Sequence, residues 1–362
     1  MEKITVPTTS LFVCSSRLFV TNEYVGKVLN NPNSTDDEMK SIQEFRRRYN
    51  SSLPNLLDHY SKILVYDPYS YYFCNTDEST LIVSNVMDKF HSMYPCFFET
   101  ELFKKEVLEV IKFPTDLAYK ELKNYVLNSP SPMMSWTMLN SQGLLIHMLL
   151  RTKYIDDFVQ EKINEGFEQF VILGAGLDSR GYRLPFKSGT TVWEVDFPEV
   201  LNYKQFVIGN AEIPKVSQAN NVFITSDLLQ SKEWTSRMDS TGFNRAKKTI
   251  WILEGLVFYI DREGTSLILK TVNSMSASGS GILYETISKR YSYHEKLNPM
   301  ITLFRVDMIT TTETPTDLLE DLCFTKDVKS LSEIDTQILY NVKKEDDNEP
   351  HVPTSFTIAY KQ

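Results

Sequence analysis

The sequence predicts an α/β fold in which a seven-stranded, mostly parallel sheet is flanked by helices. Three observations predict it. Short apolar, β-rich segments alternate with helical segments between residues 169 and 287. The first strand segment ends in two closely spaced glycines, and the segments that follow end in polar, mostly acidic residues. Because the carboxyl ends of parallel strands meet at one edge of a sheet, these side chains are expected to line a ligand site there.

The strand expected over residues 170–173 and the turn after it organise the chain. Residues 169–184 read QFVILGAGLDSRGYRL. The apolar run is too short for a helix and suits a strand buried on both faces. Gly174 and Gly176, on either side of Ala175, let the backbone turn tightly and approach a ligand. This strand, turn and helix open a Rossmann-type nucleotide fold, but Ser179 stands where the dinucleotide fingerprint has its third glycine, which disfavours NAD.

The second strand is expected over Thr190–Val195 and ends at Asp196, twenty residues beyond Gly176. An acid at this spacing can accept hydrogen bonds from both hydroxyls of a ribose. The alternative is that Glu194 or Asp196 is a surface carboxylate at the end of a strand. We expect Asp196 to bind a nucleotide sugar.

Two more parallel strands carry polar residues at their ends. Residues 221–225 are followed by Ser226, Asp227 and Leu228, and residues 249–253 by Glu254 and Gly255. Asp227 could instead cap the helix that follows it. The remaining expected elements are a helix over 262–276, a fifth strand over 281–287, a loop over 311–317, and antiparallel strands over 325–327 and 354–360 around an acidic turn at 343–349.

The region before residue 169 is expected to be mainly helical. An amphipathic helix over 35–49 opens with a capping box of Thr35 and Glu38. Residues 101–127 are helical apart from a break at Pro114, and residues 138–165 form one long helix. The Tyr- and Phe-rich segments 64–74 and 91–98 suit a core, or the lining of a pocket for an apolar acceptor.

Taken in order, the motifs resemble the leucine carboxyl methyltransferase family of S-adenosylmethionine (SAM)-dependent enzymes. They read GAGLDSRGYRL, EVDFPEVLNYK, SDLL and ILEGLVFYI, and LRTKYIDD at residues 150–157 resembles the family's arginine motif. The resemblance covers residues 145–290 well and the first 120 hardly at all. It implies a Rossmann-like class I methyltransferase domain over 136–362. Residues 1–135 depart from the family pattern, and we expect them to form a helical N-terminal cap that selects the substrate.

The resemblance also implies a cofactor site. Its arginine binds the carboxylate of SAM's methionine part, which gives that role to Arg151. A guanidinium pairs a carboxylate bidentately and stays charged when desolvated, although Arg151 could instead pair with Asp156 or Asp157. The expected SAM-binding residues are Arg151, Gly174, Ala175, Gly176, Asp196, Phe197, Asp227, Leu228 and Glu254. The candidate catalytic residues are Glu254, Tyr259 and His147.

The expected reaction transfers a methyl group from SAM to an oxygen of a small molecule. A carboxylate acceptor needs no base, whereas a phenol or alcohol would need one, and His147 and His294 are candidates. The alternative acceptor is the C-terminal leucine carboxylate of a protein. Two other classes stay open: an NAD(P)-dependent oxidoreductase, and a silent SAM-fold protein that acts as a binding partner.

Composition excludes several other classes. The net charge of −9 over 362 residues argues against a general nucleic-acid binder. The four scattered cysteines and the five histidines show no metal-ligand spacing, so we expect no metal, and reduced thiols in the cytoplasm. No apolar run reaches the roughly 20 residues of a membrane span, and Arg17 interrupts the N-terminal apolar segment, so we expect neither a membrane span nor a signal peptide. The sequons at Asn33 and Asn50 are then chance matches.

Overall fold

The structure is a computed structural model that describes residues 10–18, 21, 65–93, 95–96, 99, 104, 118–128, 142–211, 213, 215–288, 312, 314–340 and 354–362. The chain divides into two compact units. The first unit contains Met1–Thr152, Val207–Ile213 and Pro299–Phe304, and the second contains Lys153–Phe206, Pro214–Asn298 and Arg305–Gln362.

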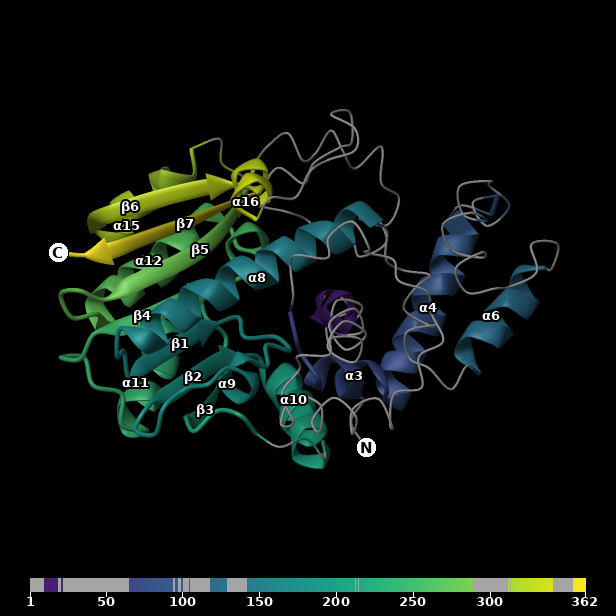
Figure 1. Ribbon diagram of the computed structural model, residues 1–362, viewed down its shortest axis with the longest axis horizontal. Coiled ribbons are helices and arrows are strands. Elements are labelled where there is room, and N and C mark those ends of the chain that lie inside the picture. Colours follow the sequence, from purple (N-terminus) through teal and green to yellow (C-terminus); the bar gives the residue numbers. More distant parts are fainter. Residues whose placement is uncertain are drawn as a thin grey trace, which may run out of the picture. The chain divides into compact units, whose positions relative to one another are not determined.

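The second unit is built on a seven-stranded sheet with the strand order β3-β2-β1-β4-β5-β7-β6 (Figure 1). The strands are β1 (Gln169–Leu173), β2 (Thr191–Asp196), β3 (Asn220–Thr225), β4 (Thr249–Leu253), β5 (Gly281–Ile287), β6 (Phe324–Ser332) and β7 (Thr354–Lys361). Strands β1 to β5 pair in parallel, whereas β7 is antiparallel to both of its neighbours. This confirms the predicted Rossmann-like class I fold, with its mostly parallel sheet and a reversed strand near the C-terminus.

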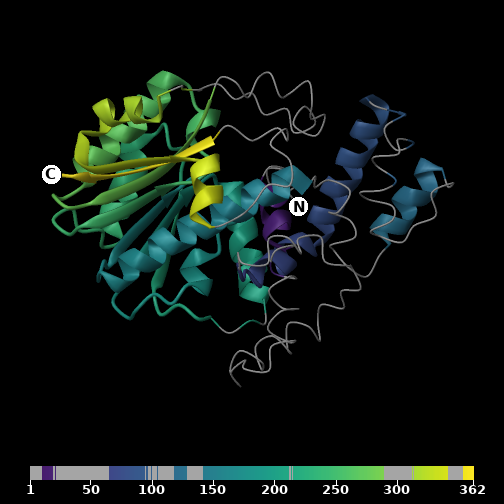
Figure 2. The same cartoon turned by 45° about the horizontal axis from the view of Figure 1, so that its top comes forward.

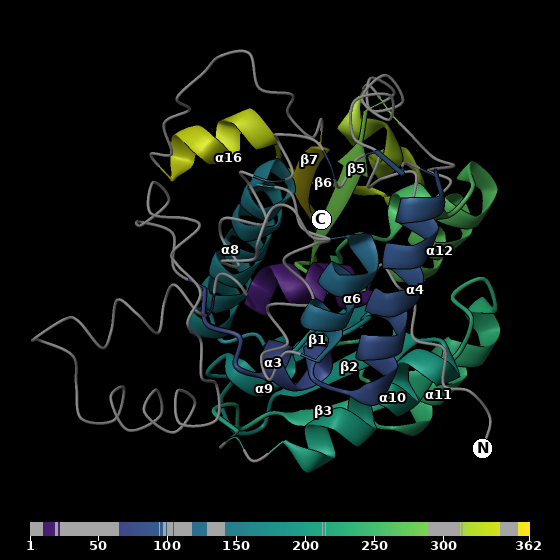
Figure 3. The same cartoon turned by 90° about the vertical axis from the view of Figure 1, so that its right-hand side faces the viewer.

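Helices cover both faces of this sheet, because successive side chains of a buried strand point to opposite faces. On one face, Val171 and Leu173 of β1 pack in a core cluster with α11 (Ser231–Ser240) and α12 (Arg262–Met275). On the other face, Phe170 and Ile172 pack against the C-terminal part of α8 (Gln142–Asn164). Figure 3 shows α8 and α12 on opposite sides of the sheet.

Short helices complete the second unit. They are α9 (Arg180–Arg183), η4 (Val257–Tyr259), η5 (Pro315–Leu318), α15 (Leu319–Leu322) and α16 (Glu333–Leu339). Helix α10 (Pro198–Asn210) starts in the second unit, directly after β2. Each parallel strand from β1 to β4 is therefore followed by a helical segment, as the alternating pattern predicts.

Two C-terminal elements differ from the sequence prediction. Strand β6 runs over nine residues rather than three, and most of its side chains are exposed. Backbone pairing with β7 holds this edge strand, so its sequence lacks the apolar pattern of a buried strand (Figure 2). The loop expected over 311–317 contains the start of η5, where Pro315 suits the first helical position and its carbonyl accepts a hydrogen bond from Tyr284 Oη at 2.8 Å.

In the first unit, the described residues are mainly helical. They include a helical segment over residues 10–18, α3 (Tyr69–Cys74), α4 (Asp77–Met93) and α6 (Tyr119–Leu127). Tyr69 and Phe73 of the aromatic segment are buried, as core residues are. A buried ion pair joins Arg17 to Asp67, with 2.8 Å between Nε and Oδ2.

Several expectations lie outside the described residues. They are the helix over 35–49, the sequons at Asn33 and Asn50, the break at Pro114, the residues around His294 and the turn over 343–349. Among the described residues, no helix is long and apolar enough to cross a bilayer. The same residues contain no group of three or more His, Cys, Asp or Glu side chains that could hold a metal ion.

Candidate functional site

The turn after β1 adopts the conformation that its glycines predict. Gly174 and Gly176 have φ angles of 65° and 47°, in the left-handed region that favours glycine. The amides of Gly174 and Ala175 both donate to the carbonyl of Val195, at 2.9 and 3.2 Å, which ties the turn to β2. A Cβ on Gly174 would lie 2.8 Å from Leu256 Cδ1, so a larger residue here would have to displace the Leu256 side chain as well as adopt the left-handed backbone angle.

Asp196 lies beside this turn, at the end of β2. Its Oδ2 accepts a hydrogen bond from the amide of Gly176 at 2.7 Å, and its Oδ1 accepts one from the amide of Phe197 at 2.7 Å. Burial raises the pKa of this carboxyl above its usual value, although the two amides act in the opposite direction. The twenty-residue spacing therefore brings Asp196 and the glycine turn into direct contact.

Asp227 and Leu228 follow β3 at the same edge of the sheet. Asp227 Oδ1 accepts from the amide of Leu229 at 2.9 Å, and the N-cap of α11 is Gln230. The prediction that Asp227 could cap that helix is therefore wrong, because Asp227 closes the preceding turn instead. The Leu228 side chain belongs to the core cluster. Phe197, by contrast, is 47% exposed.

Glu254 and Tyr259 follow β4, the strand on the other side of β1. Glu254 is mostly buried, and its Oε2 accepts from Arg180 Nη1 at 2.5 Å. The amide of Gly255 donates to Oε2 of Glu285, on β5, at 3.0 Å. Tyr259 ends η4 and is 36% exposed, with its ring edge-on to Phe258 at 4.5 Å between centroids.

A buried ion network connects the ends of β1 and β4 with α8, and sequence reasoning missed it. Arg180 donates from Nε to Asp156 at 2.7 Å, and from Nη1 to Asp178 at 2.6 Å and to Glu254. Arg183 pairs with both oxygens of Asp156, at 2.6 and 2.8 Å. The available signal is the pair of arginines three positions apart, with Asp178 two positions before the first of them, in the motif GAGLDSRGYRL.

Arg180 is 2% exposed. Burial disfavours its charged form, yet Asp178, Glu254 and Asp156 outweigh that effect and raise the pKa of the guanidinium well above its ordinary value. Its Nη2 atom is buried and has no hydrogen-bond partner among the described residues.

Arg151 and His147 lie on α8, in the first unit, and their exposed fractions are 6% and 2%. Arg151 Nη1 lies 3.9 Å from the sulfur of Met148. The two acids suggested as its alternative partners have other contacts. Asp156 belongs to the ion network, and Asp157 accepts from Lys153 at 2.5 Å and from Tyr340 Oη at 2.8 Å.

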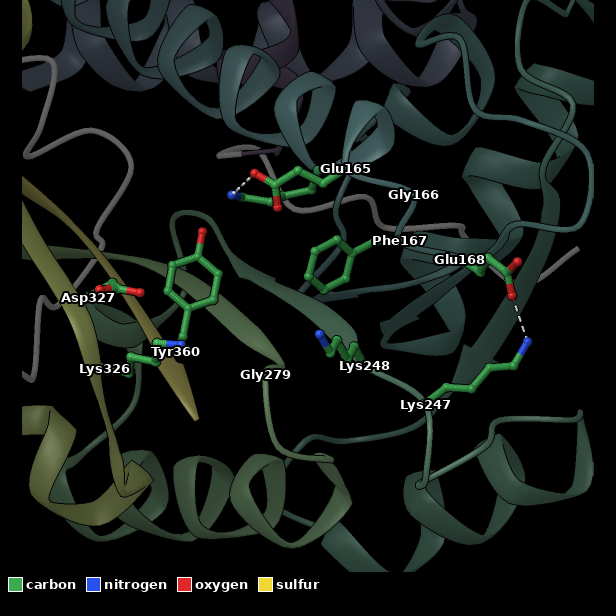
Figure 4. Close-up of a pocket in the computed structure, with 11 residues that line it drawn as sticks. Glu165, Gly166, Phe167, Glu168, Lys247, Lys248, Gly279, Lys326, Asp327 and Tyr360 are labelled. Atoms are coloured by element: carbon green, nitrogen blue, oxygen red, sulfur yellow. Dashed lines mark hydrogen bonds and ion pairs between the residues drawn. The ribbon is translucent and has the colours of Figure 1, made fainter. Parts of the chain in front are cut away.

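A pocket of 660 Å³ lies at the opposite edge of the sheet, where β1, β4 and β5 begin (Figure 4). Its lining includes Phe167 and Tyr360, and lysines that carboxylates partly neutralise. Lys162 pairs with Glu165 at 2.8 Å. None of the residues expected to bind a cofactor lines this pocket, and ligands of open α/β sheets bind at the carboxyl ends of the strands. We therefore assign the candidate site to the carboxyl edge.

Curated proteins that are similar to this chain include two bacterial relatives. A protein from Mycobacterium avium (strain 104), named by inference as a SAM-dependent methyltransferase, is 36% identical over 151 residues, which is 42% of this chain and 48% of the relative. A protein from Frankia alni with a similar name is 35% identical over 139 residues, or 38% of this chain and 48% of the relative. The chain thus matches about half the length of these curated relatives.

Solved structures with related folds include a methyltransferase from Thermobifida fusca, also named by inference. Its TM-score is 0.46 and its identity 13%, over 74% of this chain and 97% of that one. The magnesium protoporphyrin IX methyltransferase of Synechocystis PCC 6803 with bound S-adenosylhomocysteine has a TM-score of 0.39 and 13% identity, over 62% of this chain and 89% of that one. The family model for leucine carboxyl methyltransferase matches residues 58–273. Since this match covers more than half of the sequence, the chain belongs to the leucine carboxyl methyltransferase family.

Proposed function

We propose that this chain is a SAM-dependent methyltransferase that transfers a methyl group to an oxygen of a small molecule. The main supporting observation is the contact between the glycine turn after β1 and Asp196 at the end of β2, in a sheet with a reversed β7. Membership of the family and the names of the curated relatives support the same activity.

The chemistry of the available side chains fits SAM. Asp196 keeps lone pairs for ribose hydroxyls after it accepts the two amides, because a carboxylate has about four acceptor sites. Asp227 would accept from the adenine amino group and Leu228 would pack against the ring, while Gly174, Ala175, Gly176 and Phe197 would border the sugar. Glu254 would accept from the ammonium of the methionine part, and Arg151 would donate to its carboxylate.

Bound SAM supplies an electrophilic methyl group on a sulfonium, and the protein's contribution is alignment and exclusion of water. Glu254 would hold the methionine part next to the end of β4. Tyr259, on η4 after the same strand, would contact the acceptor. A carboxylate acceptor needs only to be positioned, whereas a hydroxyl acceptor needs a base, for which His147 is our candidate.

The dinucleotide alternative is disfavoured by strand order. The dinucleotide-binding Rossmann sheet is parallel throughout, in the order 3-2-1-4-5-6, whereas here the antiparallel β7 lies between β5 and β6. A silent binding protein is disfavoured because the acids at the ends of β2 and β4 are both present. We place the activity in the cytoplasm, because all four cysteines are free.

Titration calorimetry with SAM and S-adenosylhomocysteine tests the cofactor. No heat of binding from folded protein at millimolar ligand would exclude the proposal. Transfer of a labelled methyl group from SAM is then screened against carboxylic acids, phenols and a peptide that ends in leucine. Labelling of the peptide alone would replace the small-molecule acceptor with the protein alternative.

A further inference from the structure

Arg180 is the hub of the ion network at the carboxyl edge of the sheet. Its Nε and Nη1 contact three carboxylates at 2.5 to 2.7 Å, those of Asp156, Asp178 and Glu254. Arg183 is also buried, but it donates to Asp156 and to the Ser179 hydroxyl. Of these two arginines, Arg180 alone has a described contact with Glu254.

The three acids come from three different elements. Asp156 lies on α8, Asp178 in the turn after β1, and Glu254 directly after β4. Strand β1 pairs with β2 on one side and with β4 on the other. Strands β2 and β3 therefore extend the sheet on one side of β1, and the later strands extend it on the other side. Ligands of open α/β sheets bind at this switch point. Arg180 therefore fixes the mutual positions of the elements that border it.

Stability alone does not account for this arrangement. Desolvating several charges costs free energy that their attraction often fails to recover, and apolar replacements are frequently as stable. The buried Nη2 atom adds a further cost, because no acceptor among the described residues faces it. A network with these costs is better explained by the position it imposes on Glu254.

We propose that Arg180 is a positioning residue that acts through Glu254 to create the recognition of a ligand's α-amino group. Its planar fork fixes the Glu254 carboxylate in one orientation, from which the carboxylate would accept a hydrogen bond from an ammonium. Arg180 itself does not touch the ligand, since it is almost completely buried. The inference rests on the proposed function, because the amino group belongs to the methionine part of SAM.

The test compares two ligands that differ only in that part. S-adenosylhomocysteine carries the amino acid, whereas 5′-methylthioadenosine has the same adenosine and thioether without it. Calorimetry gives the affinity for S-adenosylhomocysteine divided by the affinity for 5′-methylthioadenosine. This ratio is measured for the parent, for Arg180→Lys and for the matched control Arg183→Lys. We expect Arg180→Lys to lower the ratio at least tenfold, because an ammonium cannot hold three carboxylates in the same geometry. Arg183→Lys should change it less than threefold.

A cycle with Glu254→Gln tests whether the effect passes through Glu254. If it does, the double variant has about the same affinity ratio as Glu254→Gln alone, since mutations that act through one group are not additive. Additive effects, an unchanged ratio in folded Arg180→Lys, or an equal loss in Arg183→Lys would each overturn the inference.

Two outcomes separate this inference from the function on which it rests. If the parent binds neither ligand, the proposed function fails. If it binds both equally well, the function stands and the inference fails. If Arg180→Lys shows no cooperative unfolding, Asp156→Asn is measured instead. This variant weakens the contact at Arg180 Nε and leaves Glu254, the partner of Nη1, unchanged. A ratio at least threefold below that of Arg183→Lys supports the role, and an unchanged ratio refutes it.

Discussion

At the scale of the residue, burial decides the chemistry of Glu194. The alternative that Glu194 is a surface carboxylate is wrong, because the side chain is fully buried on β2 and pairs with the buried Lys204 of α10. Burial outweighs the attraction of Lys204 and raises the pKa of Glu194 from 4.5 to about 7. The folded protein thus holds this proton more tightly than the unfolded chain does.

This shift predicts a pH dependence of stability. Stability contributed by the protonated carboxyl is complete below about pH 4.5 and is lost as the pH rises to about 7. The free energy of unfolding, measured in urea across this range, should therefore fall more steeply with pH in the parent than in Glu194→Gln. Equal pH slopes would show that Glu194 is ionised in both states.

A second prediction at this scale concerns Arg151. If Arg151 pairs with the carboxylate of SAM, Arg151→Ala removes a desolvated, charge-assisted pair. The binding free energy should then weaken by about 2–5 kcal/mol, or roughly 30- to several thousand-fold in affinity. Arg151→Lys should recover only part, because it keeps the charge and loses the fork. Calorimetry and the thermal midpoint are measured together. Parent-like affinity in Arg151→Ala would make this arginine structural, and only weak binding by a well-folded variant supports the role.

At the scale of the element, the turn between β1 and α9 depends on Gly174 for two separable reasons. An alanine there must take a φ of 65°, which costs roughly 1–2 kcal/mol, and its Cβ would also press on Leu256. Gly189→Ala is the control, since Gly189 has a φ of 89° and nothing within 4 Å of its added Cβ.

We expect Gly174→Ala to lower the free energy of unfolding by more than Gly189→Ala does, with the excess removed when Leu256→Ala is added. Denaturant unfolding of the three variants measures this. Equal losses at the two glycines would mean that Leu256 moves aside at no cost, leaving the backbone angle as the only constraint.

The sequence could predict the elements whose bounds are set by their own residues, and it could not predict those whose bounds depend on a distant partner. Strand β4 has the predicted bounds because all five of its residues are buried and four of them in succession, Ile250 to Leu253, are apolar. Strand β6 was predicted too short, because its partner β7 lies some 30 residues away and its own side chains are mostly exposed. The contacts of Arg180 with Asp156 and Glu254 join residues 24 and 74 positions apart, which no local pattern encodes.

The candidate site was predictable to the same extent. The spacing from Gly176 to Asp196 anticipated their contact, because strand, turn and helix lengths in this unit vary little. The order of the strands beyond β5 was not predictable from spacing. A reversed strand inserted between β5 and β6 depends on long-range pairing, and it separates the two nucleotide-binding alternatives.

At the scale of the whole molecule, the reversed β7 favours a SAM-binding sheet over a dinucleotide-binding one. It therefore predicts which nucleotide stabilises the folded chain. A ligand that binds only the folded state adds RT ln(1 + [L]/Kd), about 2.7 kcal/mol at a hundred times Kd, which raises the midpoint of a chain this long by a few degrees. S-adenosylhomocysteine should raise it steadily with the logarithm of its concentration, whereas NADH and NADPH should leave it unchanged. Asp196→Ala is the control, since it removes the expected ribose acceptor and should abolish the shift. A shift with NADH alone would assign the sheet to the oxidoreductase alternative. A shift that survives in Asp196→Ala would place the ligand away from the carboxyl ends of β1 and β2.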